Sequence, residues 1–318
     1  MAARQATRLD DLGLPYESSY QNTVGSRLGA TWNLWRKYPL GVIGGMIIVA
    51  VVATSFLAPL IAPNDPRDFA GGVLESPSGN FLLGTNNLGQ DVFSRALYGA
   101  QVSIAVGVSA TFIGVFTGTT LGIISGYFGG WSDTIITRIA EIIASIPALV
   151  LVLAILSAIG RPTSTGSDVF TIAWQLKAVE VAIGIAFIFA TLRVIRSAVF
   201  TQRELPYVEA AQSIGASSFR ILWRHILPNV LSLVIILFTT LIGVVILIEA
   251  AISFLGYGVA VGTPSWGIDL SGRNREFFVQ APWLIAGPGI ALSLTVLGFN
   301  FLGDALRDIL DPRLRGSR

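Results

Sequence analysis

The sequence predicts an all-α integral membrane protein with six transmembrane helices. The 318 residues are 53% hydrophobic, have a mean hydropathy of +0.69 and include only 13% charged residues, whereas soluble domains carry about 25%. Backbone groups find no water in hydrocarbon, so long apolar segments must be helical there, and the segments lack the alternation of a β-barrel. The apolar runs are long enough to span a bilayer and lie at about 40–62, 102–124, 133–159, 178–200, 229–255 and 283–303.

The distribution of Lys and Arg predicts the orientation of these helices. Five lie in the N-terminal segment, five between residues 193 and 225, and four in the C-terminal tail, but only two lie in each of the segments 63–101, 160–177 and 257–282. Basic residues near membrane spans accumulate on the cytoplasmic side. We therefore expect both termini and the segment between the fourth and fifth spans to be cytoplasmic.

The expected organisation is a single membrane domain. The first apolar run begins near residue 40 and is longer than a signal-peptide core, so no cleavable signal is expected; an interfacial helix is expected around Gly25–Lys37. A short external helix is expected near Asp91–Tyr98, capped by Asn86 or Asn87. The predicted parts are a cytoplasmic tail (1–39), the first transmembrane helix (40–62), an extracytoplasmic segment with the short helix (63–101), a five-helix core (102–304) that includes a coupling segment (201–228), and a cytoplasmic tail (305–318).

Two spans carry unusual residues. The second has a glycine at every fourth position on one helix face, which predicts close helix packing, either as a seam in a moving bundle or as static packing. In the third, Arg138 and Glu141 are three residues apart and can pair, and Pro147 should kink the helix. Together with Asp133, these charges fit anchoring at the cytoplasmic end. The four glycines are Gly114, Gly118, Gly122 and Gly126.

The segment between the fourth and fifth spans has the pattern of two short helices. Pro206 suits a first helical turn, Gly215 suits the left-handed position after a helix end, and Ser217 can cap the next helix. Phe219, Leu222, Trp223 and Ile226 then fall at i, i+3, i+4 and i+7, an apolar stripe, before Pro228 closes the segment. Such a helix-turn-helix can lie in a groove of a partner protein or can pack on its own bundle.

Several motifs along the chain are similar to those of one transporter family. Glu209-Ala210-Ala211, Gly215 and Ile226-Leu227-Pro228 resemble the signature loop of permeases of bacterial ATP-binding-cassette importers. Further stretches, between about Tyr38 and Arg315, resemble the C-type permease subunit of the dipeptide/oligopeptide/nickel branch. They are Leu83-Gly84-Thr85-Asn86, Leu88-Gly89-Gln90-Asp91-Val92, Ser94-Arg95, Tyr98-Gly99-Ala100, Gly126-Tyr127-Phe128-Gly129-Gly130, Ser253-Phe254-Leu255-Gly256, Thr263-Pro264-Ser265-Trp266-Gly267, Ala281-Pro282-Trp283, Gly303-Asp304-Ala305-Leu306-Arg307-Asp308 and Leu310-Asp311-Pro312-Arg313.

The resemblance implies the fold of a type I importer permease in a bacterial inner membrane. It implies a heterodimer with a related B-type permease, two cytoplasmic ATPase subunits and an extracytoplasmic substrate-binding protein. It fits dipeptides, oligopeptides, glutathione or nickel chelates as substrate. The residues expected to couple to the ATPase are Glu209, Ala210, Ala211, Gly215, Phe219, Leu222, Trp223 and Pro228.

The chain departs from the family pattern on its external side. Gln90 and Gln101 stand where Arg is more frequent, segment 160–177 is longer, and Val259–Gly262 replaces a Pro-rich stretch. These departures concern substrate choice and docking of the binding protein, not the transporter class.

Nucleotide chemistry is expected in partner subunits. A phosphate-binding loop needs glycine directly before lysine, but Lys37 and Lys177 follow Arg36 and Leu176. The chain is therefore expected to bind no cofactor and to be no enzyme, with ATP and magnesium used by the ATPases. The absence of cysteine excludes disulfides and thiol chemistry.

Two other classes of function are alternatives. An ion-coupled secondary transporter would use Glu249, Asp133 and Glu141, since acids within a membrane are often functional. A membrane enzyme would have to use His225, the only histidine, without a recognisable triad or metal set. Glu249 and Asn300 are the candidate residues of the translocation pathway; for Glu249 the alternative is a structural hydrogen-bond network.

Overall fold

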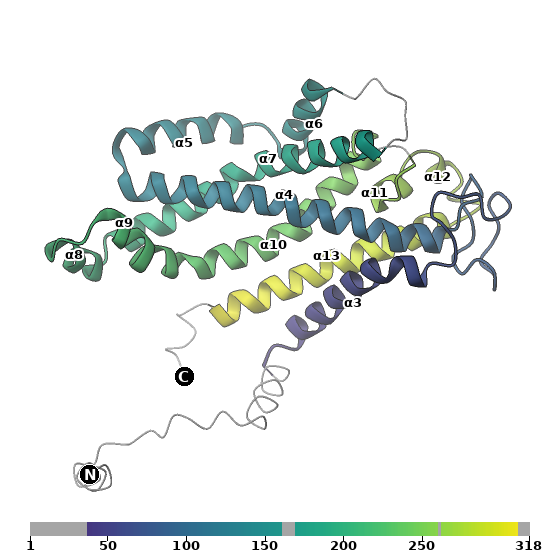
Figure 1. Ribbon diagram of the computed structural model, residues 1–318, viewed down its shortest axis with the longest axis horizontal. Coiled ribbons are helices and arrows are strands. Elements are labelled where there is room, and N and C mark those ends of the chain that lie inside the picture. Colours follow the sequence, from purple (N-terminus) through teal and green to yellow (C-terminus); the bar gives the residue numbers. More distant parts are fainter. Residues whose placement is uncertain (1–36, 161–168, 260–261, 311–318) are drawn as a thin grey trace, which may run out of the picture.

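The computed structural model describes residues 37–160, 169–259 and 262–310 (Figure 1). Most of the predicted N-terminal tail, the interfacial helix expected around Gly25–Lys37, and residues 311–318 of the predicted C-terminal tail therefore lie outside the described residues. The described part is helical and contains no β-strand, apart from an isolated bridge between Thr85 and Asp91. The helices are α3 (Pro39–Ile61), α4 (Val92–Phe128), α5 (Gly130–Ala144), α6 (Ala148–Ile159), α7 (Val169–Arg203), α8 (Pro206–Ser213), α9 (Ser218–Ile221), the π-helix η1 (Leu222–Ile226), α10 (Leu227–Phe254), α11 (Trp266–Asp269), α12 (Gly272–Glu276) and α13 (Trp283–Leu310).

The long helices confirm the all-α membrane fold. Among the described residues, five helical segments are long and apolar enough to cross a membrane, and a sixth span results if α5 and α6 count as one. Figure 1 shows α4, α7, α10, α13 and α3 running lengthwise, with α8 and α9 at one end and α11 and α12 at the other. The two ends of the molecule are therefore built from different short elements.

The third span is broken rather than kinked. Helices α5 and α6 meet at 92°, and Pro147 is the residue immediately before α6. Proline has no N–H to donate and disfavours a helical conformation in the residue before it, so the helix stops and restarts in a new direction. The position of the break was predicted, but its size was not.

The glycine stripe of α4 forms its contact with α7. A Cβ atom at Gly118 would lie 2.6 Å from the carbonyl oxygen of Ile188, and one at Gly126 would lie 2.8 Å from that of Arg196. Gly114 and Gly122 face α7 in the same way. The predicted close packing is thus confirmed, because the two backbones are too near for any side chain between them.

The external segment before α4 differs from the expectation. Residues 92–101 are not a separate short helix but the first turns of the 37-residue α4. Asp91, not Asn86 or Asn87, caps this helix by accepting hydrogen bonds from the N–H groups of Phe93 and Ser94. Asn86 instead accepts from the N–H groups of Leu88 and Gln90 within a turn.

A buried ion pair ties this external segment to the far part of the chain. The guanidinium of Arg95 on α4 contacts the carboxylate of Asp269 on α11, with an Nη2–Oδ1 distance of 2.6 Å. Burial raises the pKa of Asp269, and the neighbouring Arg95 opposes that rise. Arg95 also donates to Gln90 Oε1 and to the carbonyl of Pro66, so one side chain joins three segments.

Helix α7 begins within the expected external loop. Segment 160–177 was predicted as a loop, but residues 169–177 belong to α7; residues 161–168 lie outside the described part, as do residues 260 and 261 of Val259–Gly262. Lys177 pairs with Glu180 one turn further along, at 2.7 Å. Helix α7 therefore begins nine residues before the predicted span 178–200.

Candidate functional site

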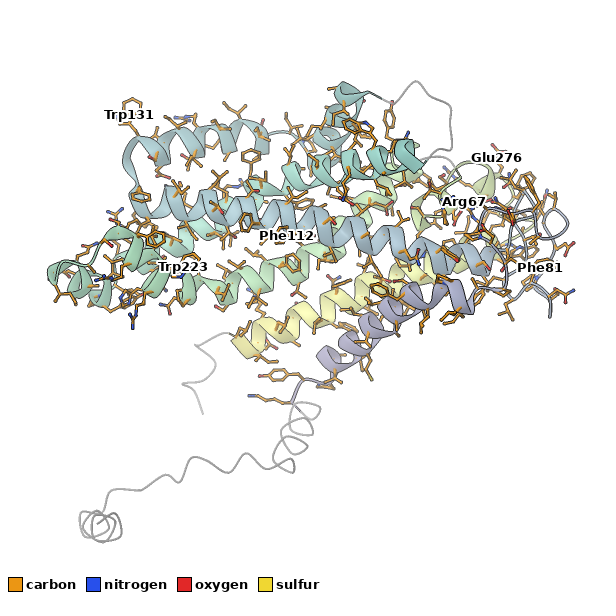
Figure 2. All side chains as sticks on the ribbon, in the orientation of Figure 1. Arg67, Phe81, Phe112, Trp131, Trp223 and Glu276 are labelled. Carbon is orange, nitrogen blue, oxygen red and sulfur yellow. The ribbon has the colours of Figure 1, made fainter. Side chains whose placement is uncertain are left out.

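The segment between α7 and α10 projects from one end of the helix bundle (Figure 1). It contains α8, a turn, α9 and η1, and it then continues into α10. Figure 2 places Trp223 of this segment and Trp131 of α5 toward one end of the molecule, and Arg67, Phe81 and Glu276 toward the other. The segment therefore lies at the end where the distribution of basic residues predicts the cytoplasm.

The turn after α8 has the geometry that its sequence predicts. Gly215 has a φ of +79°, in the left-handed region. The N–H of Ala216 donates to the carbonyl of Ala211, and the N–H of Gly215 to that of Gln212, which together form a Schellman motif. Ser217 then caps α9 by accepting from the N–H of Arg220 at 3.4 Å. The predictions for Gly215 and Ser217 are confirmed.

One side of the segment is anchored in an apolar cluster. Val208 and Ala211 of α8 are buried with Ile221, Ile226 and residues of α4, α7 and α10. The other side of α8 is free of such contacts, and Glu209, Ala210 and Gly215 are exposed. An element that is packed against the bundle on one side and exposed on the other is suited to docking against another protein.

The predicted apolar stripe is divided between two sides. Ile226 is buried and Leu222 half-buried, but Phe219 and Trp223 are 74% and 66% exposed. The cause is the π-helical turn η1, which inserts an extra residue per turn and changes the facing of the side chains. Phe219 and Trp223 stack on each other, with ring centroids 6.2 Å apart and planes at 9°. The stripe is therefore not one continuous docking face.

Pro228 does not end the segment. It lies exposed in the first turn of α10, where proline is tolerated. The helix runs on through η1 into α10 without a turn. An unbroken helix thus joins α9 to a membrane-spanning helix.

A cluster of hydrogen-bonded side chains that the sequence did not predict lies where the segment joins the bundle. The hydroxyl of Tyr207 donates to Gln202 Oε1 at 2.6 Å and accepts from Asn229 Nδ2 at 3.3 Å. Desolvation raises the pKa of Tyr207, and the hydrogen bond from Asn229 opposes this. The ring of His225 lies 6.1 Å from that of Tyr207. These hydrogen bonds join the start of α8 to the start of α10. Tyr207 and Asn229 are too far apart in the sequence for helical periodicity to indicate their contact.

A second connection links the end of α7 to α4 and α5. The guanidinium of Arg196 binds both carboxylate oxygens of Asp133, with Nη2–Oδ2 at 2.6 Å, and Ser125 donates to the same carboxylate. Arg203, the last residue of α7, donates to the carbonyl of Tyr127 at 2.8 Å. The helix that enters the coupling segment is therefore attached to its neighbours by directional bonds.

The two candidate pathway residues lie in different environments. Glu249 of α10 is fully buried, and its carboxylate accepts hydrogen bonds from Ser103, Ser253 and Ser265 at 2.8–3.1 Å. This arrangement matches the structural network that was the alternative for Glu249. Asn300 of α13 is exposed, beside Gly243 of α10.

The described residues supply no metal site, since no group of three or more His, Cys, Asp or Glu side chains gathers among them. Arg138 and Glu141 pair as predicted, with Nη1–Oε2 at 3.0 Å. Asp133, Glu141 and Glu249 each have their own partners, and no chain of polar groups among the described residues joins them.

Comparisons with known proteins agree with this architecture. Residues 118–316 match the family described as binding-protein-dependent transport system inner membrane component, and residues 26–77 match the N-terminal transmembrane domain of oligopeptide transport permease C. The chain is 36% identical to the glutathione transport system permease protein of Pectobacterium atrosepticum, over 89% of this chain and 90% of that protein. It is 36% identical to the dipeptide transport system permease protein of Alkalihalophilus pseudofirmus, over 88% of each chain.

Family membership settles the class of protein. The chain is a multi-pass inner-membrane protein and a transport subunit rather than an enzyme, and the importers of this family also contain ATPase subunits and a substrate-binding protein. This chain belongs to the inner-membrane components of binding-protein-dependent transport systems, as a permease subunit of an ATP-binding-cassette importer.

Proposed function

We propose that this permease imports dipeptides, oligopeptides or a related small solute such as glutathione, as half of a heterodimer with a B-type permease. The similarity to dipeptide and glutathione permeases supports this substrate class. Both termini face the cytoplasm in this proposal, which rests on the distribution of Lys and Arg. The chain binds no cofactor, and ATP and magnesium act in the two ATPase subunits.

The geometry of the segment from α8 to η1 carries the mechanism. Its exposed surface, formed by Glu209, Ala210 and Gly215, docks on one ATPase, while Ala211 holds it to the bundle. Phe219 and Trp223 extend the docking surface on the side of α9. Closure of the ATPase pair pushes the segment, and its uninterrupted helical connection to α10 carries the movement into the membrane.

Leu222 and Pro228 have supporting roles in this mechanism. Leu222 packs partly against the apolar cluster and begins η1, so it positions the stacked aromatic pair. Pro228 fixes the direction of the first turn of α10. Asn300, which is exposed on α13, remains a predicted residue of the translocation pathway. Glu249 could meet solute only if the three serines around it moved away.

Two substitutions in the docking surface test the coupling. Glu209→Lys reverses a charge at the surface, and Gly215→Asp adds a charged side chain to the exposed turn, at a φ of +79° that aspartate adopts more readily than most L-residues. We expect normal membrane insertion, less ATPase retained on purification and loss of ATP-driven uptake. Glu276→Lys is the matched charge reversal at the opposite end of the molecule (Figure 2) and should retain the ATPase.

The uptake assay uses the complex purified with its natural partners and placed in liposomes with ATP on the ATPase side. Alanyl-alanine and glutathione serve as labelled probes. Full uptake by both Glu209→Lys and Gly215→Asp would contradict the docking role. Uptake by the single chain under a proton gradient would instead support the ion-coupled alternative.

A further inference from the structure

Helix α5 has an exposed side that divides into two stripes of opposite character. Its inner face, centred on the buried Ala140, packs toward the bundle. Exposed residues of α5 then fall at i, i+4 and i+7 in two neighbouring rows, each on one face of the helix. The polar stripe is Thr134, Arg138 and Glu141, and the apolar stripe is Ile135, Ile139 and Ile142.

The charged residues of the polar stripe, Arg138 and Glu141, follow the exposed Trp131 by seven and ten residues along α5. Trp131, 83% exposed at the start of α5, marks the interfacial level at which tryptophan is enriched. Glu141 is ten residues further along, about 15 Å at the helical rise, in a hydrocarbon core about 30 Å thick. Arg138 and Glu141 are nevertheless 74% and 61% exposed. Charged groups at such depth face protein or a water-filled cavity.

The break between α5 and α6 points to water independently. Ser145, Ile146 and Pro147 are non-helical and exposed, and the N–H groups that begin α6 receive no side-chain cap. Non-helical backbone at membrane depth is tolerated only where it is buried in protein or lines an aqueous cavity. The break follows directly on the polar stripe, so both features mark one surface.

We infer that the polar stripe of α5 and the break at residues 145–147 line the aqueous translocation pathway, with Arg138 and Glu141 facing the passing solute. The apolar stripe packs against lipid or the second permease. This inference rests on the proposed function and names the contact within it: the guanidinium meets a solute carboxylate, and the carboxylate meets an ammonium group. When a zwitterionic peptide binds, its carboxylate takes the place of Glu141 beside Arg138, and its ammonium group takes the place of Arg138 beside Glu141.

The position of α5 sets this surface apart from the earlier pathway prediction. In Figure 1, α5 lies along α4 on the side away from α13, the helix that carries Asn300. The arginine and the glutamate also remain separate from the connection between Asp133 and Arg196, which faces α7. Labelling at Asn300 therefore distinguishes the two faces.

Cysteine accessibility tests the lining directly, because the chain contains no cysteine of its own. Neighbouring residues give matched pairs at equal depth: Arg138→Cys with Ile139→Cys, and Glu141→Cys with Ile142→Cys. In the assembled complex, a charged, water-soluble methanethiosulfonate reacts with a hydrated thiolate. We expect Arg138→Cys and Glu141→Cys to react roughly tenfold or more faster than their neighbours. Equal rates within a pair, or a faster isoleucine position, would overturn the inference.

Blocked peptides test the contact with solute. Arg138→Gln should raise KM for alanyl-alanine several-fold more than KM for its carboxamide. Glu141→Gln should likewise raise KM for alanyl-alanine several-fold more than KM for the N-acetylated peptide. A purely structural role would change the turnover of free and blocked probes equally. If the unaltered complex imports neither alanyl-alanine nor glutathione, the proposed substrate class fails, while the labelling rates still decide whether this surface is wet.

Discussion

A single methyl group at Gly118 should disrupt the seam between α4 and α7. In Gly118→Ala the new Cβ would lie 2.6 Å from the carbonyl oxygen of Ile188 and 2.7 Å from Cβ of Thr191, whereas ordinary contacts begin at 3.4 Å. The carbonyl belongs to the α7 backbone and cannot rotate away alone. The two helices must therefore separate locally by roughly 0.8 Å, the difference between 3.4 and 2.6 Å.

The expected cost follows from overpacking. Inserting a methyl group into a packed interior costs about 1–3 kcal/mol, offset by the gain of about 1 kcal/mol from replacing glycine by alanine in a helix. Gly45→Ala in α3 is the matched control, because nothing lies within 4 Å of its Cβ position. It receives the helical gain without the clash. The difference between the two variants isolates the clash at about 1–3 kcal/mol.

Thermal unfolding of the purified complex in detergent measures this difference. At about 2–4 °C per kcal/mol, Gly118→Ala should unfold roughly 2–12 °C below Gly45→Ala. Equal midpoints for the two variants, or a higher midpoint for Gly118→Ala, would refute the backbone contact between α4 and α7. Uptake should fall with the seam variant, because α7 leads directly into the coupling segment.

Four further substitutions probe the polar connections. Asp133→Arg and Arg196→Asp should each reduce uptake and thermal stability, and the double exchange should restore both in part; failure of the pair to rescue would refute a direct link. Arg95→Met leaves Asp269 buried without its partner, which costs about 3–5 kcal/mol, so a complex of unchanged stability would contradict this pair. Glu249→Gln keeps an oxygen acceptor and should preserve assembly and uptake, whereas marked loss of uptake with intact assembly would favour a pathway role.

The elements that sequence predicts well are those set by local rules. Gly215 was identified because only a left-handed residue ends α8 in this way, and the glycine stripe of α4 because close approach of helices requires it. The π-helical turn at Leu222–Ile226 left no such mark, so Phe219 and Trp223 were assigned to the same face as the buried Ile226.

Contacts between distant segments were the other part that escaped prediction. Arg95 and Asp269 are 174 residues apart, and neither has a neighbour in sequence that indicates the other. The cap of α4 shifted to Asp91 because Asn86 is used in its own turn. The two stripes of α5 follow from residue spacing. Only the structure shows which side of α5 is exposed and that the break between α5 and α6 reaches 92°.

The docking role of the coupling segment is tested most directly by photo-crosslinking in the assembled transporter. A photoreactive side chain at Ala210 lies on the exposed surface of α8, and the same group at Glu276 lies at the opposite end. The position at Ala210 should form a covalent adduct with an ATPase subunit, and the position at Glu276 should form none. An adduct of the ATPase with Glu276, or none with Ala210 in a complex that transports, would contradict the account.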